Sequence, residues 1–211
     1  MKRILVINPN SSAAVTQGIR DALAHWPGAR FDVTDLPAAP ATIASEADVA
    51  RAGVMLAERV AAEPADAYVI ACFSDPGLDM ARSLTIAPVI GIMEAGILTA
   101  MARADRFGIV ALSPGSVARH LRRMRGMGVL DRLAGDLPLG SVSAEDAGRS
   151  DAVYADTLKL GRQLVTQGAG AIVPGCAGFA PRRAQLEHDL GVPVIDPVQA
   201  ACAIALGALL A

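Results

Sequence analysis

The sequence predicts an α/β protein of two pseudo-twofold-related lobes, each a mainly parallel four-stranded sheet flanked by helices. Short β-branched segments alternate with longer helical stretches, which is the pattern of βαβ units. The strand segments are apolar nearly throughout, as expected for parallel strands that are covered on both faces. Landmarks of the first half recur about 103 to 105 residues later, which indicates an internal duplication. We therefore expect an active site in the cleft between the two lobes.

Two cysteines are the clearest duplicated landmarks. Cys72 closes the apolar segment 67–72, and Cys176 closes the similar segment 169–176. About sixteen residues beyond each cysteine a second matching pair follows, at 87–90 and 192–195. Chance rarely keeps one offset over several landmarks. We expect an N-terminal lobe over 1–98, a C-terminal lobe over 99–197, and a final helix, 198–211, that packs back on the first lobe.

The individual elements follow from local signals. Ser11 and Ser12 come after the first strand and mark a helix start, the segment 45–48 resembles a capping box before a helix to about Ala62, and Ser113 with Pro114 marks a third start. The Ala- and Pro-rich stretch 37–43 is the longest predicted loop and a candidate lid or specificity loop. The predicted strands are 3–8, 29–34, 67–71 and 88–91 in the first half, and 106–111, 137–142, 170–174 and 193–195 in the second.

Composition excludes several function classes. The net charge is −2 and aromatic residues make up 3%, which argues against a nucleic-acid surface. The basic cluster 119–125 is interpreted as a solvated helix face or a subunit contact, and a homo-oligomer is expected. The apolar run 198–211 is too short to span a bilayer, so no membrane association is expected. His25, His120 and His188 are scattered, and no metal site is expected.

The three cysteines point to a reducing compartment. The chain passes from Met1 almost directly into a strand pattern without a signal peptide, so we expect a cytoplasmic protein with reduced thiols. A disulfide between Cys72 and Cys176 is the structural alternative. Cys202 lies inside an Ala-rich helix, where packing in the core explains it.

Polar and thiol side chains gather at predicted strand ends. Asn8, Cys72, Ser113 and Cys176 all follow strands, and ligands of open α/β sheets bind beyond those carboxyl ends. A cysteine pKa is ordinarily about 8.5, and a helix N-terminus lowers it. One cysteine as thiolate can remove a proton next to a carbonyl, while the other as thiol returns one on the opposite face. Backbone N–H groups in the two turns could hold the enolate oxygen.

Three motifs together resemble a known family. They read NPNSS at 8–12, ACFSDPGL at 71–78 and GCAG at 175–178, and with Thr16 they resemble the hydantoin/allantoin racemase branch of the aspartate/glutamate racemase superfamily. The resemblance runs nearly end to end. It implies a two-base racemase without a cofactor, acting on a small molecule with a hydantoin-like ring, in which Cys72 and Cys176 are the acid/base pair. The implied substrate-binding residues are Asn10, Ser11, Phe73, Ser74, Ala177 and Gly178.

Details of the motifs bear on the substrate. Amino-acid racemases of the superfamily favour Asn-Thr after the first cysteine and Thr-His after the second, unlike the residues at 73–74 and 177–178 here. Related hydantoin racemases usually carry Ile-Glu where this chain has 39–44. The substrate therefore stays open between hydantoins, allantoin and another carbon acid. Glu94 is given no catalytic role, and Asp75 is expected to stabilise its turn.

Two kinds of alternative function remain. One is another thiol-dependent enzyme of the superfamily: an amino-acid racemase, an arylmalonate decarboxylase or a maleate isomerase. The other is a non-catalytic two-lobed protein that binds a ligand or senses redox state through the two cysteines. Proton exchange at a carbon acid separates the racemase from both.

Overall fold

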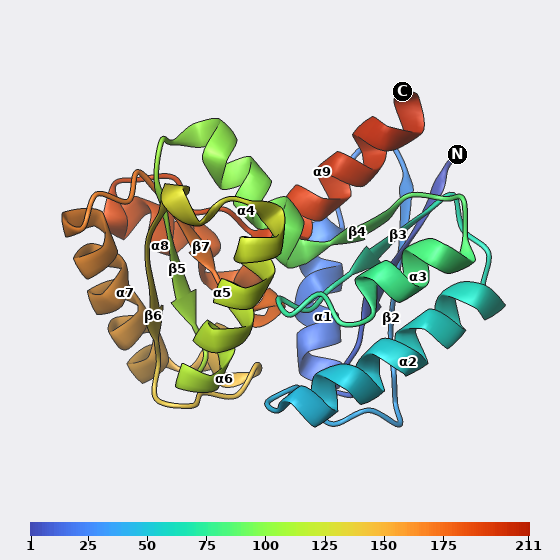
Figure 1. Ribbon diagram of the computed structural model, residues 1–211, viewed down its shortest axis with the longest axis horizontal. Coiled ribbons are helices and arrows are strands. Elements are labelled where there is room, and N and C mark those ends of the chain that lie inside the picture. The colour runs from blue at the N-terminus through green and yellow to red at the C-terminus, as the bar shows by residue number, and fades with distance from the viewer. The chain divides into compact units, whose positions relative to one another are not determined.

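The computed structural model describes all residues from Met1 to Ala211. The chain forms two compact units, one of Met1–Ala95 with Val198–Ala211 and one of Gly96–Pro197 (Figure 1). Unit 1 and unit 2 below refer to these two sets of residues.

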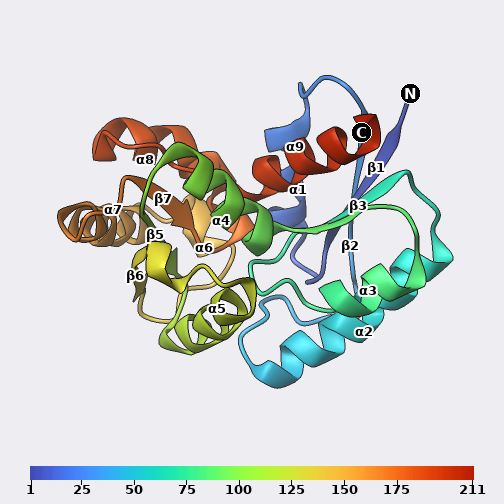
Figure 2. The same cartoon turned by 45° about the horizontal axis from the view of Figure 1, so that its top comes forward.

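Unit 1 contains a four-stranded parallel sheet in the order β2-β1-β3-β4. Helices α1 and α9 lie on one face of this sheet, and α2 and α3 lie on the other (Figure 2). The two strands in the middle, β1 and β3, are buried over nearly their whole length, because helices cover both of their faces. The elements are β1 (Arg3–Asn8), α1 (Ala13–Leu23), β2 (Arg30–Asp35), α2 (Glu46–Ala62), β3 (Ala67–Ile70), α3 (Leu78–Leu84), β4 (Val89–Gly91) and α9 (Pro197–Leu210).

The predicted helix starts in unit 1 are confirmed. Ser45 and Asp48 form a reciprocal capping box, and α2 runs from there to Ala62. Ser12 caps α1 by accepting a hydrogen bond from the N–H of Val15. These caps fix where each helix leaves the preceding loop.

Unit 2 repeats the strand order of unit 1 with three parallel strands, β6-β5-β7. Helix α5 lies on one face of the sheet, and α7 and α8 lie on the other (Figure 2). Ser113 caps α5 with Pro114 in the first turn, as predicted. The elements are α4 (Ile92–Arg103, which begins in unit 1), β5 (Phe107–Ala111), α5 (Pro114–Met127), η1 (Leu130–Arg132), β6 (Leu133–Pro138), α6 (Asp146–Arg149), α7 (Asp151–Thr166), β7 (Ala171–Pro174), η2 (Ala177–Arg182) and α8 (Arg183–Leu190).

Two details of unit 2 differ from the prediction. The strand expected at 137–142 is β6, which lies four residues earlier and includes Gly135 and Asp136, residue types that strands disfavour. The fourth strand expected at 193–195 is reduced to one bridge between Ile172 and Val194, so the second sheet has three strands. The fold class itself is confirmed: two parallel sheets flanked by helices.

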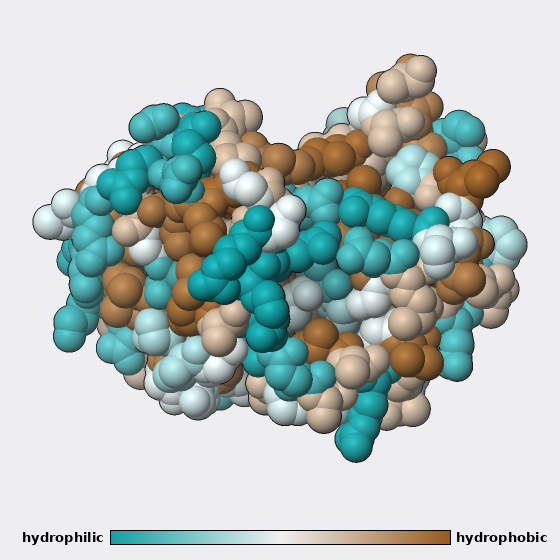
Figure 3. All heavy atoms as spheres, in the orientation of Figure 1, coloured by the Kyte–Doolittle hydropathy of each residue, from teal (hydrophilic) through white to brown (hydrophobic).

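Apolar side chains on the surface gather at the end of α3 and in the loop after it (Figure 3). Met80, Leu84 and Ile86 are exposed there. None of the helices is both long enough and apolar enough to cross a membrane.

Candidate active site

The carboxyl edge of the unit 1 sheet brings together the loops after β1 and β3. These strands are neighbours, and the N–H of Ala71 donates to the carbonyl of Ile7 at 2.8 Å. Parallel strands end at the same edge, so the segment with Asn10 and Ser11 and the turn with Cys72 leave the sheet side by side. The predicted residues Phe73 and Ser74 belong to that same turn.

Asn10 is held by a buried polar network. Its Oδ1 accepts from Asn8 Nδ2 and from the N–H of Ser12, each at 2.9 Å. Asn8 Nδ2 also donates to Thr16 Oγ1 at 3.0 Å, and Thr16 bonds to Asp35 at 3.1 Å. Because the oxygen of Asn10 is engaged twice, its Nδ2 group is what the side chain can offer to a ligand.

The predicted loop 37–43 packs on the segment after β1. The N–H of Ser11 donates to the carbonyl of Pro40 at 3.2 Å, and the N–H of Leu36 donates to the carbonyl of Asn10. The backbone N–H of Ser11 is therefore used within the fold, and only its partly buried hydroxyl side chain remains for a ligand.

Cys72 is partly buried and begins a tight turn after β3. The N–H of Asp75 donates to the carbonyl of Cys72 at 2.9 Å, and Asp75 has a φ of +43°. The Asp75 carboxylate accepts from the N–H groups of Met93 and Glu94, both at 3.0 Å. Asp75 thus stabilises the turn, as expected, and it does so by capping α4.

Cys176 holds the equivalent position in unit 2, after β7. It is the N-cap of η2, and its Sγ accepts a hydrogen bond from the N–H of Gly178 at 3.3 Å. A side chain on Gly178 would collide with the carbonyl of Ala144, so the backbone approaches closely because residue 178 is glycine. An N–H aimed at the sulfur stabilises a thiolate more than a thiol.

A buried histidine–aspartate pair lies beside this turn, and the sequence analysis did not find it. His120 Nδ1 and Asp136 Oδ2 are 2.8 Å apart, with side chains 2% and 1% exposed. His120 Cε1 lies 3.4 Å from where a Cβ of Gly175 would stand. The local sequence carries no signal for it, because Asp136 lies just before the predicted strand 137–142 and reads as a loop residue.

The remaining candidates have structural explanations. Glu94 pairs with Arg82 at 3.2 Å near the start of α4. Cys202 is fully buried in α9. None of the three cysteines forms a disulfide, and no group of three or more His, Cys, Asp or Glu side chains is placed to hold a metal ion.

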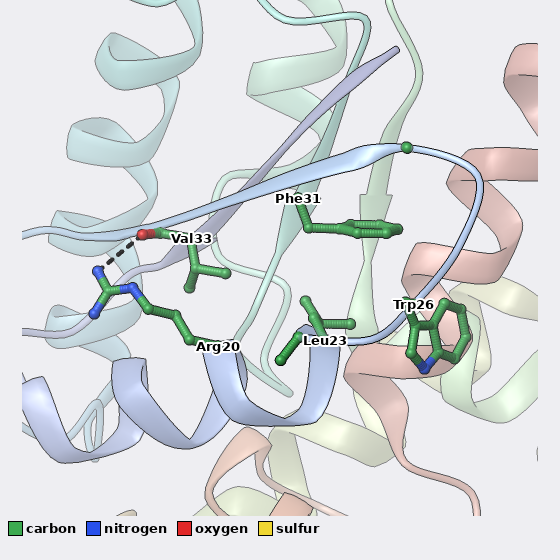
Figure 4. Close-up of a pocket in the computed structure, with 7 residues that line it drawn as sticks. Arg20, Leu23, Trp26, Phe31 and Val33 are labelled. Atoms are coloured by element: carbon green, nitrogen blue, oxygen red, sulfur yellow. Dashed lines mark hydrogen bonds between the residues drawn. The ribbon is translucent and has the colours of Figure 1, made fainter. Parts of the chain in front are cut away.

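A pocket of about 300 Å³ in unit 1 has a different character (Figure 4). Arg20 and Leu23 reach it from α1 and Phe31 and Val33 from β2, with Trp26 at its edge. The Arg20 guanidinium donates to the carbonyl of Val33 at 3.0 Å. No thiol, hydroxyl or carboxylate lines this pocket, so none of the candidate acid/base residues belongs to it.

Comparisons with known proteins agree with this arrangement. Residues 4–205 match the family model described as Asp/Glu/Hydantoin racemase. A hydantoin racemase of Paenarthrobacter aurescens is 41% identical over 212 residues, which cover 96% of this chain and 89% of that protein. A hydantoin racemase of Rhizobium meliloti is 37% identical over 222 residues, covering 96% and 86%. The solved structure of allantoin racemase from Klebsiella pneumoniae superposes with a TM-score of 0.91 at 34% identity, over 100% of this chain and 88% of that one.

The family model, the relatives and the solved structure each match this chain over nearly its whole length, including both units and both cysteine turns. The chain belongs to the Asp/Glu/Hydantoin racemase family and is an isomerase of the racemase type.

Proposed function

We propose that this enzyme inverts the C5 carbon of a 5-monosubstituted hydantoin or of allantoin, with Cys72 and Cys176 as its acid/base pair. The observation that carries the proposal is the matched placement of the two thiols. Each cysteine is the second residue after a parallel strand that neighbours the first strand of its sheet, β3 beside β1 and β7 beside β5. The relatives named hydantoin racemase and allantoin racemase support the choice of substrate.

The chemistry is a proton transfer on each face of one carbon. One cysteine, as thiolate, takes the C5 proton, and the electron pair of the broken C–H bond moves into the enolate of the neighbouring ring carbonyl. The other cysteine, as thiol, then delivers its proton to the opposite face of C5. The first cysteine ends as thiol and the second as thiolate, ready for the opposite enantiomer. No cofactor takes part in this cycle.

The surroundings of Cys176 suit this role. The N–H of Gly178, at 3.3 Å from the sulfur, lowers the free energy of the thiolate and so favours Cys176 as a base. Cys176 is also only partly buried, as a residue that meets a substrate needs to be. Proton transfer by a well-placed group contributes roughly 10² to 10⁴ in rate.

The enolate oxygen needs donors of its own. The backbone N–H groups of Ser74 and Ala177, one in each cysteine turn, make no hydrogen bond within their units. They are the turn amides best suited to bind a ring carbonyl whose charge grows during the reaction. The Asn10 Nδ2 group, whose partner oxygen is already engaged, is a third donor.

The turns also fit a neutral ring better than a free amino acid. Phe73, Ser74, Ala177 and Gly178 bring no charge to the cysteines, and the one nearby carboxylate, that of Asp75, is engaged by two N–H groups of α4. A zwitterionic substrate would leave a buried ammonium and carboxylate without partners in these turns, which is costly. A hydantoin ring instead presents carbonyl oxygens to N–H donors.

The test is to incubate single enantiomers of several 5-monosubstituted hydantoins and of allantoin with the enzyme in deuterated water. We expect loss of optical rotation together with deuterium at C5. Retained rotation and no exchange across the panel would reject the substrate. Release of carbon dioxide from a disubstituted malonate would instead assign the thiols to a decarboxylase.

A further inference from the structure

The His120–Asp136 pair links helix α5 to the edge strand of the unit 2 sheet, beside the backbone of Gly175. His120 comes from α5 and Asp136 from β6, the edge strand. The central strand β5 lies between β6 and β7. Gly175, the last residue before Cys176, follows β7 and donates its N–H to the carbonyl of Val110 in β5 at 2.9 Å. The imidazole therefore reaches across the central strand, from Asp136 to the backbone that carries Cys176.

The Nδ1 of His120 faces Asp136. With the Asp136 carboxylate as acceptor, the Nδ1 of His120 donates the hydrogen bond of the 2.8 Å contact. The ring then presents its Cε1 edge to Gly175, 3.4 Å from the position where that glycine would carry a Cβ. A Cβ at residue 175 would also stand 3.0 Å from the carbonyl of Val110, so a side chain there would be crowded.

The duplicated half uses the same helix position for a similar purpose. The offset of 104 residues that separates Cys72 from Cys176 also relates Thr16 to His120. Thr16 is fully buried in α1 and bonds to Asn8 at the end of β1 and to Asp35 at the end of β2. In each unit, a buried polar side chain of the helix that follows the central strand thus bonds to an aspartate of the neighbouring edge strand.

A contribution to stability does not by itself explain the His120–Asp136 pair. The other oxygen of Asp136, Oδ1, is buried and has no hydrogen-bond partner. A buried pair of polar side chains that leaves one oxygen unsatisfied is often no more stabilising than apolar side chains of similar volume. Because the pair leaves one buried oxygen unsatisfied and lies against the backbone of the Cys176 turn, it points to a role in the site.

We propose that His120, held by Asp136, is a positioning residue for Cys176: the imidazole braces the Gly175–Cys176 backbone so that the sulfur stays aligned with the N–H of Gly178. Its effect on turnover rests on the proposed function, whereas its effect on the Cys176 thiol does not. Loss of the brace lets the sulfur move, and a misplacement of about 1 Å costs roughly 10² in rate.

Three variants of the full chain test the role. His120→Asn keeps a donor near the position of Nδ1 for Asp136 but removes the ring edge beside Gly175. The double variant His120→Leu/Asp136→Leu removes the brace and leaves no unpaired buried charge. Tyr154→Phe is the matched control. It also removes a partly buried hydrogen bond of unit 2, the one that the Tyr154 hydroxyl of α7 donates to Asp189 of α8 at 2.6 Å.

The first readout is the racemisation kinetics. For both brace variants we expect kcat to fall by about 10²-fold with a smaller change in KM, since the reacting sulfur is misaligned and the proposed donors of unit 1, those of Ser74 and Asn10, are unaffected. Tyr154→Phe should keep kcat. Thermal unfolding midpoints show that each variant is folded.

The second readout needs no substrate. In a Cys72→Ala background, where the two thiols cannot titrate together, the pH dependence of Cys176 alkylation by iodoacetamide is followed by mass spectrometry. Both brace variants should raise the pH midpoint, because the Gly178 N–H no longer stabilises the thiolate, and Tyr154→Phe should not. An unchanged midpoint and kcat in a folded double variant would overturn the proposal. If the parent enzyme racemises no hydantoin, the proposed function fails, and the alkylation midpoint still decides the role of His120.

Discussion

The carboxylate of Asp75 occupies the space in which residue 91 would carry a side chain, so it fits against Gly91 only because that residue is glycine. From there Asp75 reaches the first N–H groups of α4, those of Met93 and Glu94. The backbone of Asp75 is held at φ +43°, which is unfavourable for a residue with a side chain. The turn that begins with Cys72 is thereby tied to the start of α4.

Gly91→Ala should break this arrangement. The added methyl group meets the carboxylate and displaces it from α4, so we expect the free energy of unfolding to fall by about 1–3 kcal/mol. We also expect kcat to fall, because Cys72 shares its turn with Asp75. Urea unfolding and racemisation kinetics measure the two effects.

Gly126→Ala is the matched control for that substitution. Gly126 is exposed on α5, and a Cβ there would meet nothing within 4 Å. Alanine at an exposed helix position should stabilise the protein by up to about 1 kcal/mol. The capping role of Asp75 is refuted if Gly91→Ala proves as harmless as Gly126→Ala.

Cys72→Ser and Cys176→Ser, made separately, test the two-base scheme. A hydroxyl is a far weaker acid than a thiol, so each change should lower racemisation by roughly 10² to 10⁴. Exchange of the C5 proton without inversion should persist for the one enantiomer whose base remains. Chiral chromatography and mass spectrometry in deuterated water distinguish the two events.

Cys202→Ala serves as the control for the cysteine variants. Cys202 is fully buried in α9, where alanine is also a small apolar residue, and activity should be retained. Full racemase activity in Cys176→Ser would contradict the scheme.

Asn10→Asp isolates the donor that we assign to the substrate. An aspartate still accepts from Asn8 Nδ2 and from the N–H of Ser12, so the loop keeps its two hydrogen bonds. It loses the Nδ2 donor and brings a negative charge toward the enolate. Loss of one such donor typically lowers kcat by about 10² to 10³.

Asn10→Ala is the companion variant, because it removes the loop bonds as well as the donor. It should lower both kcat and the free energy of unfolding, whereas Asn10→Asp should act mainly on kcat. Steady-state kinetics and urea unfolding separate the two. If Asn10→Asp keeps the parent's kcat, the Nδ2 group does not contact the substrate in the transition state.

Local signals in the sequence were sufficient for much of the fold. The first strand, 3–8, and the helix from Ser45 to Ala62 were predicted with their observed bounds, because an apolar run and a capping box are local features. The placement of both cysteines at strand ends followed from the same signals. These are properties of a few neighbouring residues.

What escaped prediction depends on partners far away in the sequence. Strand β6 was placed too late because Asp136 reads as a loop residue, and its burial makes sense only with His120, sixteen residues earlier on α5. The cap that Asp75 provides for α4 likewise joins residues 18 and 19 positions apart. Periodicity and propensity carry no information on such pairs.

Arg3 holds a surface cluster that makes stability depend on pH. Its guanidinium contacts Asp32 at 2.6 Å and also binds Glu63, and these side chains are about a quarter to a third exposed. Hydrogen bonding to Arg3 is the main cause that lowers the pKa of both carboxyls, with smaller contributions from Arg30 at Asp32 and Arg59 at Glu63. Solvent screens pairs of this kind, so each contributes roughly 0.2–1 kcal/mol.

The lowered pKa values fix the sign of the effect. A carboxyl whose pKa is lower in the folded protein stabilises it above the unfolded pKa, and this contribution is lost as the pH falls through the folded value. Arg3→Gln should therefore lower the free energy of unfolding at pH 7 and reduce the further loss between about pH 5 and pH 3. Arg20→Gln is the control, because Arg20 donates to a carbonyl, that of Val33, and should leave the pH dependence unchanged. Urea unfolding at several pH values measures how the free energy of unfolding of each variant depends on pH. If this dependence is the same for Arg3→Gln and the parent, the cluster does not govern acid stability.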